Sequence, residues 1–171
     1  MSLGRSHPVV LLAVGALLVP ATASAAPVIE STPAEVGVLS PLSVIKRADL
    51  DFGTVVVTGA GTAVVDPVSG TLTTTGAVTK SGTAAHRALF TSTGSKNSVV
   101  HIRLPQNPIT VTRVGGTETM TVSTWTLDGP TNRKIPLNST FDFGVGATLT
   151  VGATQAEGSY TGTFTITVQY P

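Results

Sequence analysis

Catalysis and metal binding depend on histidine, cysteine and carboxylate side chains, and this 171-residue sequence offers few of them in useful spacing. It contains no cysteine, and beyond residue 25 its histidines are His86 and His101. These two form no His-x-His pair, so a metal site would need carboxylates from elsewhere. Asp49 and Asp51 share one face of an expected strand, but Ca²⁺ takes about six to eight oxygens. We therefore expect no metal site and no cofactor.

Two glycine-containing stretches are similar to nucleotide-binding motifs, but neither is complete. "DFG" at Asp51–Gly53 lacks the glycine-rich loop, the paired lysine and the catalytic loop of a kinase. "GVGATLTVG" from Gly144 lacks the Lys-Ser/Thr of a phosphate-binding loop and a following helix. No serine lies in a Gly-x-Ser-x-Gly motif, so no catalytic residue can be named. These observations favour a protein that is not an enzyme.

Trp125 is the only tryptophan, and it precedes the loop sequence "LDGPTNRK". An exposed indole beside a polar loop could stack on a sugar ring and make this protein a glycan-binding module. In a β-sandwich a single tryptophan is more often part of the core. Both interpretations of Trp125 stay open at this point.

The N-terminus has the pattern of an export signal. Arg5 precedes an apolar run over Val9–Val19, and "ATASA" then supplies small residues for cleavage after Ala25. The run is too short to span a bilayer, which takes about 20 residues. We therefore predict a signal peptide over residues 1–25, an extended N-terminal arm over 26–40 and one domain over 41–171. The expected location is the periplasm, the cell surface or the medium.

Charge is balanced once the predicted signal peptide is removed. Loss of Arg5 leaves nine basic and nine acidic residues. Without a basic stripe, nucleic acid is not an expected partner. A neutral surface also lets copies of the chain approach one another, so self-association is compatible with this composition.

Short runs rich in Val, Ile and Thr alternate with turn clusters from Leu42 onward, at intervals of roughly ten residues. This spacing predicts a single all-β antiparallel sandwich of about seven to nine strands. Between Phe141 and Val151 the odd positions are apolar and the even ones are small or polar, which predicts one buried face. In "MTVSTWTL" the apolar phase slips, which predicts a bulge near Ser123–Thr124. A membrane β-barrel, the alternative, would need longer strands and aromatic girdles.

The last residues, Gly158–Pro171, alternate most regularly of all. The apolar members are Tyr160, Phe164, Ile166, Val168 and Tyr170. Such a strand is either central in a sheet or an edge that a partner covers. The segment carries no charged side chain of the kind that keeps an exposed edge strand from aggregating. The sequence therefore favours the central position.

Two segments, "DLDFGTVVV" and "FGVGATLTVGATQAEGSYTGTFTITVQYP", resemble family 4402 of the domains of unknown function, exported proteins of Gram-negative bacteria. The resemblance spans about Pro41 to Tyr170. More distantly, the two ends are similar to the spore coat protein U domain and to chaperone–usher pilins, with Tyr170 at the penultimate position of the final strand.

This resemblance implies an immunoglobulin-like, pilin-like sandwich at the cell surface or in the periplasm. It also implies association with copies of the chain, or with a periplasmic chaperone, through strand pairing. Pro27 and Pro33 interrupt the arm, so the arm is a poor donor of a strand. The expected role is a non-enzymatic structural or surface protein, with a carbohydrate-recognising adhesin as the alternative.

Overall fold

The computed structural model describes residues 35–171, and the regular elements in this range are β-strands. The eleven strands are β1 (Ser43–Ala48), β2 (Thr54–Val65), β3 (Leu72–Ser81), β4 (Ala88–Thr93), β5 (Val99–Arg103), β6 (Ile109–Arg113), β7 (Thr119–Leu127), β8 (Asn132–Lys134), β9 (Thr140–Val151), β10 (Tyr160–Thr161) and β11 (Thr167–Gln169). Within this range there is no helix long and apolar enough to cross a membrane. The predicted signal peptide and residues 26–34 of the predicted arm lie outside the described residues.

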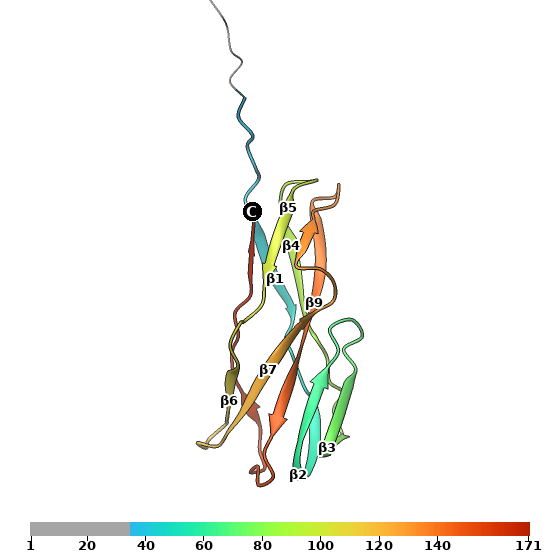
Figure 1. Ribbon diagram of the computed structural model, residues 1–171, viewed down its shortest axis with the longest axis vertical. Coiled ribbons are helices and arrows are strands. Elements are labelled where there is room, and N and C mark those ends of the chain that lie inside the picture. Colours follow the sequence, from blue (N-terminus) through green and yellow to red (C-terminus); the bar gives the residue numbers. More distant parts are fainter. Residues whose placement is uncertain (1–34) are drawn as a thin grey trace, which may run out of the picture. The chain divides into compact units, whose positions relative to one another are not determined.

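The strands form two antiparallel sheets, which confirms the predicted all-β sandwich (Figure 1). The larger sheet has the order β1-β4-β9-β7-β6-β10, and the β2–β3 hairpin joins it through β9. The smaller sheet has the order β11-β5-β8. The strand count exceeds the predicted seven to nine partly because the final run is divided into β10 and β11, and partly because the short β8 forms in the stretch after Trp125 that was expected to be a loop.

β9 is the centre of the larger sheet because it has partners along both edges. β7 pairs along one edge, while β4 and β2 follow one another along the opposite edge. The predicted alternation is confirmed, since Phe143, Val145, Ala147, Leu149 and Val151 are all buried.

The glycines between these apolar residues of β9 are buried as well, which the alternation did not predict. A Cβ at Gly146 would collide with the backbone carbonyl of Val65, and one at Gly144 with that of Pro67. Glycine is therefore required where the end of β2 crosses β9.

The predicted bulge in β7 is confirmed. The register between β7 and β9 shifts between Ser123 and Thr126, and Thr124 has a positive φ of 50°. Because of this extra residue, Val122 on one side of the bulge and Trp125 on the other both pack against the core.

Two groups of buried residues form the core, one around Ala147 and Leu149 and one around Phe143 and Val145. In the second group the rings of Phe90 and Phe143 stack with their centroids 5.3 Å apart. Burying each large apolar side chain stabilises the fold by about 1.5–3 kcal/mol.

Threonines cover the solvent side of the larger sheet. One row of cross-strand neighbours crosses β3, β2, β9, β7 and β6. It consists of Thr75, Thr62, Thr150, Thr121 and Thr110. The division into a buried face and a polar face, predicted from the alternation in Phe141–Val151, is therefore present in this sheet, and threonines form the polar face.

Candidate functional site

Three of the residues considered for metal binding lie together at one place. Asp51 and His86 form an isolated antiparallel bridge, and His86 Nδ1 lies 2.9 Å from the carbonyl oxygen of Asp49. His86 Nε2 is 3.7 Å from a carboxylate oxygen of Asp51. Among the described residues, no group of three or more His, Cys, Asp or Glu side chains is arranged to hold a metal ion. These contacts instead tie the segment before β2 to the segment before β4.

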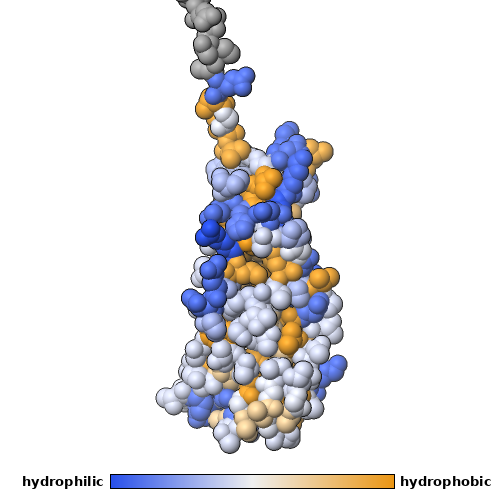
Figure 2. Space-filling view, in the orientation of Figure 1, coloured by the Kyte–Doolittle hydropathy of each residue, from blue (hydrophilic) through white to orange (hydrophobic). Residues whose placement is uncertain are grey.

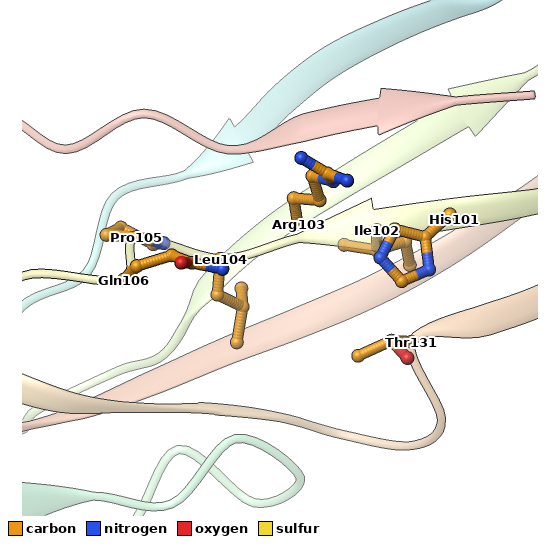
Figure 3. A pocket seen from close by; sticks show the side chains of 7 residues that line it. All are labelled: His101, Ile102, Arg103, Leu104, Pro105, Gln106 and Thr131. Carbon is orange, nitrogen blue, oxygen red and sulfur yellow. The ribbon is translucent and has the colours of Figure 1, made fainter.

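His101 lies far from this place in the fold, on β5 of the smaller sheet (Figure 3). Its Nδ1 is 2.6 Å from Oδ1 of Asn132 on β8. A carbonyl oxygen only accepts hydrogen bonds, so Nδ1 donates and Nε2 stays available on the solvent side. The structure does not bring His101 and His86 together.

Trp125 packs against core residues. Its ring lies 4.7 Å from the ring of Phe164, centroid to centroid, and it contacts both buried groups. The indole N–H is buried and has no hydrogen-bond partner among the described residues. Trp125 as a whole is partly buried, so part of its surface remains exposed.

The C-terminal segment, Tyr160–Tyr170, is paired along one edge only. β10 pairs with β6 and β11 pairs with β5, while residues 162–166 between them belong to no strand. The prediction that this segment is central and paired on both sides is therefore wrong. Leu104–Pro108 links β5 to β6 and carries two prolines, which cannot donate ladder hydrogen bonds, so the pairing is interrupted there.

The even-numbered side chains of the C-terminal segment do face the core, as predicted. Phe164, Ile166 and Val168 pack against the group around Phe143, and the intervening residues are exposed. However, these three side chains are only partly buried. A strand that completes a sandwich normally buries its inner face, so the covering layer is incomplete here.

β1 has the same property at the opposite end of the larger sheet. It pairs with β4 alone, and Val44 lies opposite the fully buried Ser92. Paired residues of antiparallel strands point to the same face, so Val44 points toward the interior, yet it is 38% exposed. Ile45 on the other face is 54% exposed.

We call the region between the free edges of β1 and the C-terminal segment the seam. The two edges run side by side (Figure 1), and no backbone ladder joins them among the described residues. Each edge presents unpaired backbone N–H and C=O groups and partly exposed apolar side chains. These are the features to which an additional β-strand can bind.

The hydroxyl of Tyr170 links the two sides of the seam at one end. The hydroxyl of Tyr170 accepts a hydrogen bond from the N–H of Ser95 at 2.7 Å and donates to the carbonyl of Ser40 at 3.0 Å. A Cβ at Gly94 would meet this hydroxyl at 2.6 Å and Leu42 at 2.9 Å, so glycine is needed there. The sequence marked Tyr170 as an apolar strand residue but gave no sign of this polar connection.

Comparison with known proteins places this arrangement in a family. A family model described as "Domain of unknown function (DUF4402)" matches residues 42–170, which include the seam and both sheets. No match was found among curated proteins or among solved structures. The chain therefore belongs to the DUF4402 family.

Proposed function

We propose that this chain is an exported, non-enzymatic structural or surface protein with a pilin-like β-sandwich, and that it associates through strand pairing at the seam. The partner strand comes from another copy of the chain or from a periplasmic chaperone. The observation that carries this proposal is the pair of free edges beside partly exposed Val44, Phe164, Ile166 and Val168.

Edge strands that lack a partner are prone to uncontrolled pairing, and proteins usually protect them. β1 is protected in this way by the exposed Lys46 and Arg47 and by a bulge between Lys46 and Ala48. The C-terminal segment has no charged side chain at all. The free edge of the C-terminal segment is therefore better explained by a partner that normally covers it.

An added strand would also complete the core. It would supply inward side chains over Phe164, Ile166 and Val168 and would pair with backbone groups on both sides. Complete burial of a large apolar side chain is worth about 1.5–3 kcal/mol. Strand addition at the seam therefore has a source of binding free energy in addition to hydrogen bonds.

Site-directed crosslinking tests this proposal directly because the chain has no cysteine. A single Val44→Cys substitution, labelled with a photo-crosslinker in the intact periplasm, should yield an adduct with a second copy or with a chaperone. The matched control is Val56→Cys on β2, where the valine is 47% exposed but lies away from the seam. Equal crosslinking at both positions, or none at Val44→Cys, would contradict the proposal.

A substitution at the seam should also change the state of assembly. Val44→Lys places a charge among the apolar side chains and should leave the protein monomeric in sedimentation velocity at concentrations where the parent chain assembles. Val56→Lys should behave like the parent. Cell fractionation of the same strains checks export, since a protein that stays in the cytoplasm cannot meet a periplasmic chaperone.

A glycan-binding module is the alternative role. Trp125, the residue first considered for it, is partly buried and packs on the partly buried Phe164. A glycan site at Trp125 would have to use the part of the ring that this packing leaves exposed.

A further inference from the structure

The outer face of the smaller sheet carries long polar side chains that point away from the core. On β5, Val100 and Ile102 are fully buried, so His101 and Arg103 face outward. Strand pairing then places other residues on the same face. Gln169 and Asn132 flank His101 in one row, Thr167 lies opposite Arg103, and Lys134 lies opposite Val99.

This region is basic, unlike the chain as a whole. The smaller sheet and its adjoining segments, residues 94–108, 128–139 and 167–171, contain four basic residues and one acidic residue. The acidic residue, Asp128, is neutralised within the fold, because it pairs with Arg133 at 2.5 Å and accepts a hydrogen bond from the N–H of Gly144. Arg103 and Lys134 form no ion pair with any described residue.

The surface differs visibly between the two sheets. In Figure 2 strongly hydrophilic residues gather on the upper part of the molecule, around the position of β5 in Figure 1. The lower part, over β2, β6 and β7, is mostly pale, as expected for residues of intermediate hydropathy such as threonine. The strongly hydrophilic surface is therefore a local feature.

The middle row of this face offers hydrogen bonds suited to sugar hydroxyls. Because Asn132 accepts from His101 through Oδ1, its amide N–H groups remain available as donors. The free Nε2 of His101 can accept from a hydroxyl, and the Gln169 amide can do both. Along the strand direction, Arg103 lies on one side of this row and Lys134 on the other.

The separation of the two charges indicates the size of the ligand. Arg103 and the residue opposite Lys134 are four positions apart on β5, which is about 13 Å at 3.3 Å per residue. Extended straight outward, Arg103 and Lys134 hold their charges about this far apart, so a ligand with several acidic groups contacts both more readily than a single phosphate or carboxylate does. A chain of linked sugars with several carboxylates can do so while its hydroxyls contact the row between them.

A hollow adjoins Arg103 at the end of β5 (Figure 3). Polar and apolar side chains line it together, including His101, Arg103, Leu104, Pro105, Gln106 and Thr131. Sugar rings have both C–H faces and hydroxyl edges, and sites that bind small molecules combine apolar surface with a few polar groups in this manner.

We propose that the outer face of β11-β5-β8 binds an acidic polysaccharide that contains uronic acids. The Arg103 guanidinium forms paired hydrogen bonds with one carboxylate, and Lys134 attracts another. The row Gln169, His101 and Asn132 orients the sugars between them. This site does not include Trp125, and its charged residues lie on β5 and β8, whereas Gln169 lies on β11, which also forms one edge of the seam.

Affinity electrophoresis of the purified full chain in gels containing polygalacturonate, or neutral dextran for comparison, tests the proposal. The parent protein should be retarded by polygalacturonate only. The double variant Arg103→Gln, Lys134→Gln should lose at least about tenfold in affinity, since a charge-assisted hydrogen bond is worth at least that factor. Both side chains are exposed, so circular dichroism should show an unchanged fold.

A matched double variant separates this site from general charge attraction. Arg47→Gln, Lys80→Gln removes the same two residue types from exposed positions on β1 and β3 of the larger sheet and should bind like the parent. Arg103→Lys should recover only part of the affinity, because lysine cannot form the paired contact.

Several results would overturn this inference. They are the absence of parental binding to polygalacturonate, equal losses in the two double variants, and equal binding to dextran. Binding to vesicles of phosphatidylglycerol that matches binding to polygalacturonate would also overturn it, since the face would then attract any anionic surface.

Discussion

β9 and the C-terminal segment carry the same alternation of apolar and polar residues, but only β9 is paired along both edges. Every inward side chain of β9 from Phe143 to Val151 is buried, whereas Phe164, Ile166 and Val168 remain partly exposed. Alternation therefore determines which way side chains point. It does not determine how many neighbours the strand has.

The difference comes from residues outside the two strands. β9 receives β2 along its second edge because Gly144 and Gly146 let the Val65–Pro67 backbone approach closely. The C-terminal segment has only β1 on its open side, and Tyr170 is its connection to that region. Four experiments test this comparison.

Deletion of Gly158–Pro171 should have the largest effect. It exposes β5, β6 and one side of the group around Phe143, so the truncated chain should not fold in soluble form. Removal of Tyr170 and Pro171 alone should leave a weakened but folded protein. Soluble, monomeric protein with native circular dichroism after the longer deletion would show that the segment is dispensable.

Phe143→Ala should destabilise the protein more than Phe164→Ala. Phe143 is fully buried against Phe90, and such a substitution costs about 3–5 kcal/mol. Phe164 is partly exposed, so its loss should cost about 1–2 kcal/mol and should alter the fluorescence of Trp125. Urea denaturation measures both values, and equal losses would mean that the seam is already closed in solution.

Tyr170→Phe should cost about 1–2 kcal/mol, because the N–H of Ser95 and the carbonyl of Ser40 both lose their partner. Amide hydrogen exchange should accelerate in β1. Tyr160→Phe is the matched control, since its hydroxyl bonds only to the nearby Ala156 and Gln155. If both variants leave exchange in β1 unchanged, Tyr170 does not fasten the seam.

The smallest effect concerns the turn that follows β2. Hydrogen bonds from the backbone and side chain of Ser69 lower the pKa of the Asp66 carboxyl below its ordinary value of 3.8. A carboxyl with a depressed pKa in the folded state stabilises above its unfolded pKa and loses that contribution as pH falls through the folded value. Asp66→Asn should therefore be slightly less stable than the parent at neutral pH, and the difference should vanish below the depressed folded pKa. Glu157→Gln, on an exposed loop, is the control in thermal melts across pH.

The sequence alone was sufficient for the fold class, the buried face of β9 and the bulge at Ser123–Thr124, because each follows from local alternation. The one-sided pairing of the C-terminal segment was predicted wrongly. The reason is that pairing depends on contacts such as Tyr170 with Ser40, which are 130 residues apart. The basic face was also not predicted, since only strand pairing brings Arg103 and Lys134 onto one face of the smaller sheet.

The direction of the strands at the seam has one more consequence. Five antiparallel steps separate β1 from β10 in the larger sheet, so the two edges of the seam run in opposite directions. A strand between them must be parallel to one and antiparallel to the other, and the two sides of such a contact are unlike. Copies joined in this way form a heterologous contact, so the assembly would grow with a defined head and tail unless two copies exchange strands reciprocally.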